Sequence, residues 1–361
     1  MRVSVDAREL VGRPTGVGRY LAELLTEWAG GDAARRHEFV LYAHGTPAWL
    51  PDAWRGQVRR LPGAGGTLWE QRDLARAIAA DRPDVHFAPA YSAPLTAAAP
   101  TVVAINDVSF LAHPEWFGRR EALRRRLITG WSARRARRIL TISEFSRGEI
   151  VSRVGVPATK IRVIYPGIRP PAATPAAARD PLVLYVGSLF QRRHVDVLIP
   201  AFGRVHAHVP EARLEIVGEN RTVPRVDFEA IVARHGLGAA VGLRAYAPED
   251  TLRDLYARAA VFVFLSAYEG FGLTPLEALA AGAAPVVLDT PVARETLGPA
   301  ATFVPRVAAF EGAVADAIHR TLVEGTARAA VLAAAPAVLG RYLWPDAAAA
   351  TLRALEEAAG A

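Results

Sequence analysis

The sequence has no cysteine among its 361 residues, which excludes disulfide bonds, thiolate nucleophiles and thiolate metal sites. It also lacks an uninterrupted apolar run of the roughly 18 to 20 residues that span a membrane. Its charged, alternating start, MRVSVDAREL, is not typical of a secretory signal. No aspartate-x-aspartate pair, G-x-S-x-G turn or P-loop occurs. These absences predict a cytoplasmic protein with neither a bound metal nor a cofactor.

Positive charge is concentrated in the first half of the chain, although the net charge is only +7. Residues 1–170 carry 26 basic and 16 acidic side chains, whereas residues 171–361 carry 17 and 20. This asymmetry predicts an anionic partner for the first half, such as a membrane surface, a phosphorylated acceptor or nucleic acid. Because no nucleic-acid module or set of base-stacking aromatic residues accompanies the charge, we expect no nucleic-acid partner.

Short β-rich runs alternate with helical patterns along the whole chain, which is typical of βαβ units with parallel sheets. The first half contains the runs RVSVDA, HEFVLYA, VHFAPA, TVVAIND and RILTIS, and the second half restarts the pattern with PLVLYVGS. Between them lies PGIRPPAATPAAARDP, whose proline and alanine content favours a linker. We predict an N-terminal domain at 1–168, a linker at 169–180, a second domain at 181–342, and a helix at 343–361 that packs back on the N-terminal domain.

The fold class that follows is α/β, with two doubly wound parallel-sheet, Rossmann-like domains facing a central cleft. Ligands of such sheets bind outside the carboxyl ends of the strands. The functional residues are therefore expected in the turns that lead from a strand to the next helix.

One such turn holds two carboxylates, in the stretch AYEGFGLTPLEALAAG at 267–282. The backbone amides at the start of the following helix have no intrahelical partner and attract phosphate, and Gly270 and Gly272 let a ligand approach the backbone. Glu269 lies before this helix start and Glu277 about one turn inside it. Carboxylates accept hydrogen bonds from the hydroxyls of a sugar or a ribose, so the pattern predicts a site for a nucleotide sugar.

This stretch resembles the glutamate-x7-glutamate signature of retaining glycosyltransferases of the GT-B fold, in the large group called family 4. Further stretches resemble landmarks of that family in the same order along the chain. They are TGVGRYLAELL, NDVSFLAHPEWF, TISEFSRGEI, IRVIYPGI, VGSLFQRRHVDVLIPAF, LEIVGEN and YAPEDTLRDLYARA. The resemblance spans nearly the whole chain.

The resemblance implies roles for the donor side. Glu269 would contact the transferred sugar near the reacting centre, Glu277 would hold the ribose, and Arg193, with Arg192 beside it, would neutralise the diphosphate. The remaining donor contacts would come from Gly16, Ser188, Gly270, Phe271, Gly272, Leu273 and Thr274. The structural alternative is that the glutamates are a loop acid and a helix-capping acid, that the arginines are a solvated pair, and that Gly16 serves a plain turn.

Two positions depart from the family pattern. Asn106 and Asp107 stand where the family often has histidine and aspartate, and asparagine cannot become cationic. Many relatives also have arginine where Ser188 stands. On the acceptor side the candidates are Asn106, Asp107 and Arg19, and the catalytic candidates of the whole chain are Glu269, Arg193 and Asp107.

The family resemblance implies a retaining, metal-independent transferase that moves a sugar from a nucleoside diphosphate to a hydroxyl of a glycan or lipid-linked glycan. The motifs look most like bacterial mannosyltransferases of surface polysaccharide assembly, so GDP-mannose is the first choice of donor. UDP-glucose and UDP-N-acetylglucosamine are the alternatives. Two other classes stay open: a glycoside hydrolase using the two glutamates, and a sugar-nucleotide epimerase on a similar fold.

An arginine-rich run, RREALRRRLITGWSARRARR at 119–138, favours two different structures. In the first, an amphipathic helix packs Leu123, Leu127, Ile128 and Trp131 on the sheet and leaves the arginines in solvent. In the second, the basic face docks on anionic lipid headgroups or on a lipid-linked pyrophosphate acceptor. The second alternative would place the protein on the inner face of the cell membrane.

Overall fold

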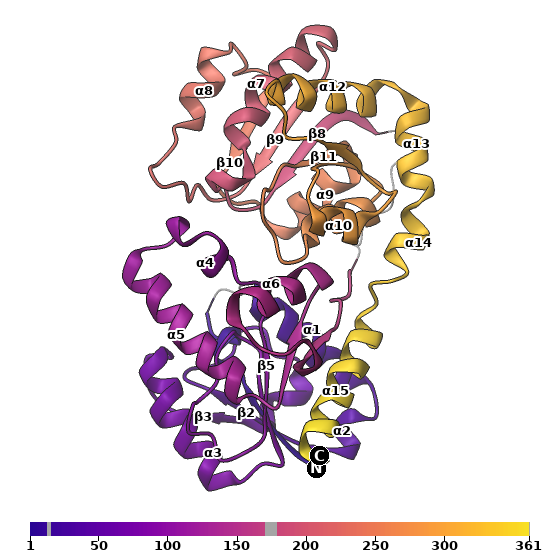
Figure 1. The fold of residues 1–361 in the computed structure, drawn as a ribbon. Coiled ribbons are helices and arrows are strands. Elements are labelled where there is room, and N and C mark those ends of the chain that lie inside the picture. Colours follow the sequence, from indigo (N-terminus) through magenta and orange to yellow (C-terminus); the bar gives the residue numbers. More distant parts are fainter. Residues whose placement is uncertain (13–15, 170–178, 361) are drawn as a thin grey trace. The chain divides into compact units, whose positions relative to one another are not determined.

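The computed structural model describes residues 1–12, 16–169 and 179–360 and divides into two compact units (Figure 1). Unit 1 comprises Met1–Gly167 and Tyr342–Ala361, and unit 2 comprises Ile168–Arg341. The division falls within one residue of the expected domain ends at 168 and 342. Most of the predicted linker, residues 170–178, lies outside the described residues.

Unit 1 is built on a seven-stranded sheet with the strand order β3-β2-β1-β4-β5-β6-β7. Every pair is parallel, and β1 lies between β2 and β4, with Val3 opposite Phe39 on one side and Val85 on the other. This order, winding outward in both directions, is that of a doubly wound sheet. The strands are β1 Arg2–Asp6, β2 Glu38–Ala43, β3 Val58–Arg60, β4 Val85–Ala88, β5 Thr101–Ala104, β6 Arg138–Thr141 and β7 Ile161–Val163.

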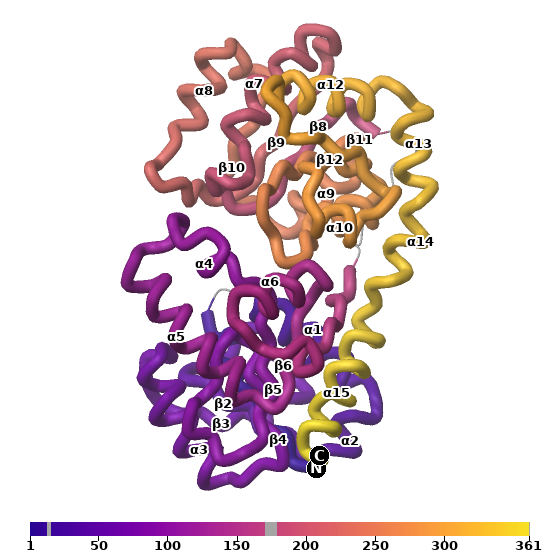
Figure 2. The backbone as a smooth tube through the Cα atoms, viewed as in Figure 1, coloured from indigo at the N-terminus to yellow at the C-terminus, as the bar shows by residue number. Residues whose placement is uncertain are grey.

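Helices cover both faces of this sheet. Val102 of β5 belongs to the core beneath α1 and α15, whereas Val103 belongs to the core beneath α5 and α6, because successive side chains of a strand point to opposite faces. The indole Nε1 of Trp28 in α1 donates to the carbonyl of Ala348 in α15 at 3.0 Å. The last helix is thus part of unit 1, as the tube in Figure 2 shows. The helices are α1 Gly16–Gly30, α2 Ala33–Arg36, α3 Ala75–Asp81, α4 Ser109–Ala112, α5 Arg119–Arg135, α6 Glu144–Val154 and α15 Trp344–Gly360, and a π-helical turn at Trp69–Leu74 precedes α3.

Unit 2 has a six-stranded parallel sheet with the order β10-β9-β8-β11-β12-β13. The central strand β11 is buried at every position, as expected of a parallel strand covered on both faces. The α/β class with two doubly wound parallel sheets is therefore confirmed. The elements are β8 Asp180–Val186, α7 Val195–His208, β9 Arg213–Val217, α8 Phe228–Arg234, β10 Val241–Arg244, α9 Glu249–Arg258, β11 Ala259–Phe264, α10 Leu273–Ala280, β12 Ala284–Leu288, α11 Pro291–Leu297, β13 Thr302–Val304, α12 Phe310–Val323, α13 Gly325–Ala333 and α14 Ala335–Leu339.

Helix α5 does not pack as its apolar stripe predicts. Leu123, Leu127 and Trp131 are 57%, 44% and 51% exposed. The side of α5 that is buried in unit 1 carries the small residues Thr129, Gly130, Ser132 and Ala133. Small side chains let a helix backbone approach the sheet closely, so the larger apolar residues are left in solvent. The expectation that this stripe packs on the sheet is wrong for all three of these side chains.

No single helix in the described part of the chain is both long enough and apolar enough to cross a membrane. The segments Phe310–Val323 and Gly325–Gly360 meet the length and composition criteria only together, as a pair bent by 87°.

Candidate active site

The first part of the candidate site lies in unit 2, where the turn after β8 approaches the end of β9. Gly187 has φ +143°, and a Cβ on it would lie 2.7 Å from Nη1 of Arg193. A Cβ on Gly218, just after β9, would lie 1.9 Å from the carbonyl oxygen of Gly187. Gly187 therefore leaves room for the Arg193 side chain, and Gly218 leaves room for the backbone of Gly187.

Arg193 and Glu269, predicted from separate motifs, form an ion pair. Nε and Nη2 of Arg193 lie 3.0 and 2.9 Å from Oε1 of Glu269. The hydroxyl of Ser266 donates to the same oxygen at 2.8 Å, and Nη1 of Arg193 donates to the carbonyl of Ser188 at 3.0 Å. The two charged side chains are only 14% and 20% exposed, so the pair is held in one geometry at the carboxyl ends of β8 and β11.

Aromatic rings complete the surroundings of the two arginines. The Arg193 guanidinium lies 4.9 Å from the ring centroid of Phe264, and that of Arg192 lies 4.2 Å from the ring of Phe190, both within cation–π range. Burial lowers the pKa of Arg193, but the Glu269 carboxylate and the Tyr185 hydroxyl more than offset this and hold its pKa above the ordinary value. Arg193 is thus a fixed positive charge at this edge of the sheet.

Helix α10 begins beside this ion pair. Its first residue is Leu273, the preceding Gly272 has φ +93°, and no side chain caps the helix start. The amides at Gly272, Leu273 and Thr274 are those that lack an intrahelical acceptor, since residue 275 is proline. A small pocket at this point is lined by Glu269, Phe271 and Gly272, together with side chains of β12 and α11.

The other donor-side candidates fall around the same turn. The Phe271 side chain is buried, and Gly270 joins it to Glu269. Glu277 lies in the second turn of α10 and is partly buried. The turn after β11 and the turn after β8 therefore bring together most of the residues named for the donor. Gly16, expected to reach the donor from the other domain, is the exposed first residue of α1 in unit 1.

The acceptor-side candidates lie at the carboxyl end of β5 in unit 1. Oδ2 of Asp107 accepts a hydrogen bond from the hydroxyl of Tyr91 at 3.0 Å, and Oδ1 accepts one from the amide of Ser109 at 2.8 Å. Asp107 is therefore oriented from two sides. The amide oxygen of Asn106 is buried without a hydrogen-bond partner among the described residues. Arg19 is exposed on α1.

Tyr91 is a strained residue. Its φ is +64°, a left-handed conformation that is a genuine outlier for a bulky side chain. Burial first, and then the neighbouring Asp107, raise the pKa of the Tyr91 hydroxyl well above its ordinary value. The hydroxyl is thus a permanent donor to Asp107 near neutral pH.

An acidic cluster lies at the carboxyl end of β1, in the same unit. Arg8 contacts both Asp6 and Glu70, with its Nη2 3.0 Å from Asp6 Oδ2, and the hydroxyl of Ser92 donates to Glu70 at 2.7 Å. Both carboxyl side chains are only 1% exposed. Burial, only partly offset by Arg8, raises the pKa of Asp6 to about 6. One arginine is therefore the cationic partner of two buried carboxyl groups.

No three histidine, aspartate or glutamate side chains gather at a metal-ligating distance in the parts of the chain that the structure describes. The charges that a ligand would meet at the two edges are therefore those of the side chains named above.

Two family models match adjoining parts of the chain. Residues 14–170 match the model described as Glycosyltransferase Family 4, and residues 171–330 match the model described as Glycosyl transferases group 1. The chain belongs to the family 4 type of glycosyltransferases. The matches meet close to the division between the two units of this family member.

The curated relatives of this family 4 chain include mannosyltransferases. O-antigen chain mannosyltransferase B of Escherichia coli is 28% identical over 227 residues, which are 60% of this chain and 57% of the relative. The GDP-mannose:cellobiosyl-diphosphopolyprenol alpha-mannosyltransferase of Xanthomonas campestris is 28% identical over 194 residues, 53% and 50% of the two chains. In these matches, the chain spans about half the length of each relative.

Among solved structures, HepE of Anabaena in complex with UDP and glucose superposes with a TM-score of 0.76. The match covers 99% of this chain and 100% of HepE, at 18% identity. Together with the two doubly wound sheets, this likeness shows that the family 4 chain has the GT-B fold.

Several residues of this family member escaped sequence analysis: Tyr91, Arg8, Glu70 and Ser266. Three of them lie two or three residues after the end of a strand, in VSVDAR, HFAPAY and FVFLS. The first polar side chains beyond a parallel strand lie at the ligand-binding edge, and this rule could have found them. Glu70 lies in a π-helical turn, a feature that is frequent at functional sites but has no sequence signature.

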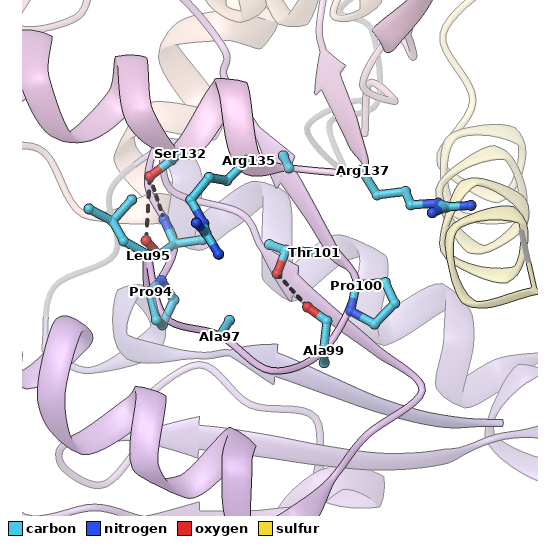
Figure 3. A pocket seen from close by; sticks show the side chains of 11 residues that line it. Pro94, Leu95, Ala97, Ala99, Pro100, Thr101, Ser132, Arg135 and Arg137 are labelled. Carbon is cyan, nitrogen blue, oxygen red and sulfur yellow. Dashed lines mark hydrogen bonds between the residues drawn. The ribbon is translucent and has the colours of Figure 1, made fainter.

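A pocket of unit 1 lies away from the carboxyl edge of its sheet. Figure 3 shows it between the loop before β5 and helix α5, with Arg135 and Arg137 beside it and Ser132 hydrogen-bonded to the backbone of Ala93. It reaches Thr101, the first residue of β5, whereas Asn106 follows the last. Thr101 and Asn106 are five residue steps apart, which places the pocket about 16 Å along the strand from Asn106, at the opposite edge of the sheet.

Proposed function

We propose that the protein is a retaining glycosyltransferase that moves a sugar from a nucleoside diphosphate sugar to an acceptor hydroxyl. The observation that carries the proposal is the Arg193–Glu269 ion pair beside the uncapped start of α10. A fixed cation and free helix amides suit a diphosphate, and the carboxylate beside them suits the hydroxyls of a sugar.

Each donor-side residue has a part in this chemistry. Arg193, with Arg192, and the amides at Gly272, Leu273 and Thr274 take up the negative charge that grows on the diphosphate as it leaves. Glu277 accepts from the ribose hydroxyls, and Glu269 contacts the sugar. Groups that are already oriented before the reaction stabilise developing charge most effectively.

In the retaining reaction the bond between the anomeric carbon and the β-phosphate oxygen breaks, and a bond to the acceptor oxygen forms on the same face. The acceptor proton passes to the departing phosphate oxygen, so no protein base is needed. The role of the protein is then to position both substrates and to stabilise charge. Because Arg193 and the helix amides supply that stabilisation, we propose that the reaction is metal-independent.

On the acceptor side we propose that Asp107 and the amide oxygen of Asn106 accept hydrogen bonds from acceptor hydroxyls. Asp107 is held by Tyr91 and Ser109, so its position is set before the acceptor arrives. Arg19 and Gly16, at the start of α1, remain candidates for contacts with acceptor and donor. The acceptor we propose is a glycan or a lipid-linked glycan.

GDP-mannose is the proposed donor, with UDP-glucose or UDP-N-acetylglucosamine as the alternative. The names of the Xanthomonas and Escherichia relatives include mannosyltransferase activity, and one of them includes a diphosphopolyprenol. The UDP and glucose found with HepE favour the alternative. A lipid-linked acceptor would place the protein on the cytoplasmic face of a membrane, as a peripheral protein.

The test begins with the donor. A thermal-shift panel of GDP-mannose, UDP-glucose and UDP-N-acetylglucosamine should give one clear stabilisation, since a ligand at 100 times its Kd stabilises the native state by about 2.7 kcal/mol. Transfer with the matched donor should then yield a product whose anomeric configuration, read by NMR, equals that of the donor. An inverted product would overturn the retaining assignment.

The same assay separates the competing enzyme classes. A glycoside hydrolase would cleave glycosides without a nucleotide sugar, and a hydrolysing epimerase would release free sugar from the donor without an acceptor. In the structure both neighbours of Glu269 Oε1, Arg193 and Ser266, donate to it. Glu269 is thus arranged as a hydrogen-bond acceptor, which favours the transferase over a hydrolase that needs an acid at this position.

A further inference from the structure

Helix α5 presents a stripe of large apolar side chains to solvent. Leu123, Leu127 and Trp131 are four residues apart and therefore lie on one face, and each is 44% exposed or more. Arg124 of this helix donates to Thr67 at 2.6 Å, and the next residue, Leu68, is 69% exposed. Contiguous exposed apolar side chains mark a surface that binds something.

Arginines border this stripe. Helix α5 carries Arg119, Arg120, Arg124, Arg125, Arg126, Arg134 and Arg135, all of them exposed, and one acid, Glu121. Glu121 is occupied by Arg124 and Arg125, each at 2.7 Å. Arg126 has no ion pair within the described residues. The surface is therefore strongly positive as well as apolar.

Arginine and apolar side chains also meet in a shallow pocket between α4, α5 and α6. Arg126, Arg134 and Arg153 line it together with Leu111, Leu127 and Trp131. Arg134 is anchored by a 3.1 Å hydrogen bond to the carbonyl of Val154, and Arg153 by its pair with Glu149 at 2.6 Å. The pocket offers guanidinium groups to an anion directly beside side chains that suit an acyl region.

We propose that this face of α5, with the α4–α6 pocket, docks on the headgroups of an anionic lipid bilayer. A helix that lies in a membrane interface combines an arginine-rich surface with tryptophan and leucine, and phosphate is the partner that suits a guanidinium fork. The arginines would contact lipid phosphates while Leu127 and Trp131 enter the boundary between headgroups and acyl chains. An acidic protein would satisfy the charge but would leave no reason for the three exposed apolar side chains between the arginines.

The position of this surface in unit 1 fits the proposed acceptor. Helix α4 begins two residues after Asp107 and contributes Leu111 to the pocket, and Figure 1 shows α4 and α5 next to each other on the outside of unit 1. A membrane docked here would present lipid-linked acceptors near Asp107. The docking itself is measured without substrate, so its failure and the failure of the proposed reaction are distinguishable.

The test is co-sedimentation of the full chain with vesicles of phosphatidylcholine alone and of phosphatidylcholine mixed with phosphatidylglycerol. Binding should require the anionic lipid and should be lost between about 0.1 and 1 M salt, as the Debye length falls from about 10 to 3 Å. Equal binding to both vesicles would overturn the proposal. So would release by millimolar inorganic phosphate at constant ionic strength, which would indicate a site for a single free anion.

Two pairs of variants compare arginines of α5 with arginines elsewhere in unit 1 that carry the same total charge. Arg126→Gln with Arg134→Gln should weaken vesicle binding about 25-fold, about fivefold for each arginine near the surface. Arg35→Gln with Arg36→Gln removes the same charge from α2, which shares the α1 side of unit 1, and should change binding by less than about twofold. Equal losses from both pairs would mean that net charge, and not this surface, binds the vesicle.

The apolar stripe is tested separately. Leu127→Gln with Trp131→Gln should weaken vesicle binding without lowering the Tm, because both side chains are exposed. The control pair, Val307→Gln with Val323→Gln, replaces side chains of unit 2 that are 48% and 54% exposed and should leave vesicle binding unchanged. Vesicles with brominated acyl chains should quench part of the tryptophan fluorescence of the protein. Trp131→Phe should remove this quenched part of the fluorescence and should leave vesicle binding intact. Unchanged quenching in Trp131→Phe would show that Trp131 does not enter the membrane and would overturn the proposed orientation.

Discussion

The carboxyl edges of the two sheets differ in local charge, and the acidic edge belongs to the half of the chain that is basic in total. In unit 1 the single Arg8 contacts two buried acids, Asp6 and Glu70. In unit 2 the carboxylate of Glu269 is paired with Arg193, and Arg192 lies next to it in sequence. The first half of the chain is nevertheless basic in total and the second slightly acidic.

The comparison teaches that the charge of a domain does not predict the charge of its site. An edge with surplus carboxylate suits hydroxyls that donate hydrogen bonds, and an edge whose arginines balance its carboxylates beside an uncapped helix start suits a diphosphate. Much of the surplus arginine of unit 1 lies on α5, away from the strand ends. We therefore propose that the anionic partner predicted from the charge of the first half meets α5 and not the acceptor edge.

The largest expected effect concerns the acidic cluster of unit 1. Arg8→Ala leaves Asp6 and Glu70 buried without their cation, and should destabilise the protein by about 3 to 5 kcal/mol. Arg59→Ala breaks an ion pair in which Arg59 is 46% exposed and should cost at most about 1 kcal/mol. Thermal unfolding of both variants measures the difference. A loss near that of the control would mean that the cluster does not depend on Arg8.

At the edge of unit 2, Glu269→Gln keeps the size of the side chain but removes its negative charge from the reacting sugar. We expect turnover to fall about 10²- to 10³-fold, the order seen for lost electrostatic groups in other enzymes, with donor Kd nearly unchanged. Kinetics and calorimetric titration measure the two quantities. Glu277→Gln serves as the matched control and should weaken the donor more than it slows turnover. Unchanged turnover with weaker nucleotide binding would move Glu269 to the nucleotide end.

The phosphate assignment is tested by Arg193→Ala. A lost charge-assisted hydrogen bond costs about 1.5 to 3 kcal/mol, so the Kd of a nucleoside diphosphate should rise roughly 10- to 150-fold while that of the free nucleoside stays the same. Arg294→Ala, at an exposed pair with Asp289 in the same unit, should leave both unchanged. If nucleoside and diphosphate lose affinity equally, Arg193 is not part of the phosphate site.

A pair of tyrosines sharpens the comparison between the two edges. Tyr91→Phe removes the donor to Asp107 and should lower kcat/KM for the acceptor roughly fivefold, the value of about one hydrogen bond, with donor Kd unchanged. Tyr185→Phe removes the 3.1 Å hydrogen bond to the carbonyl of Ser188 and should act on donor Kd instead. Bisubstrate kinetics separate the two effects. Equal changes in both substrates for Tyr91→Phe would reduce its role to general packing.

The smallest expected effect is that of a chelator. Because the cation and the helix amides of unit 2 are proposed to neutralise the diphosphate, excess EDTA should leave the transfer rate unchanged. The rate is measured with the matched donor in EDTA and again after magnesium or manganese is added. A loss in EDTA that either ion restores would contradict the proposed phosphate site.

The long periodic elements were predictable from the sequence because local pattern is sufficient for them. The alternation of strands and helices predicted two parallel sheets, and the turn at 267–282 was found from two carboxylates, two glycines and a proline. The three-residue edge strands β3, β7 and β13 were not predicted as strands. A strand that short contains too few residues for a periodic pattern, and its pairing depends on the neighbouring strand.

Residue spacing by itself determined the α/β class, the two sheets and the turns that carry Arg193, Glu269 and Asp107, because a period of two or about 3.6 residues is a local property of the chain. Only the tertiary structure decided that Arg193 contacts Glu269, 76 positions away, and that Tyr91 is bent into a left-handed conformation to reach Asp107. The same is true of α5, whose leucines and tryptophan look like a core stripe by spacing alone. Which side of a helix is buried depends on how closely its backbone fits the sheet, and here the small residues Thr129 and Ala133 fit and the large ones do not.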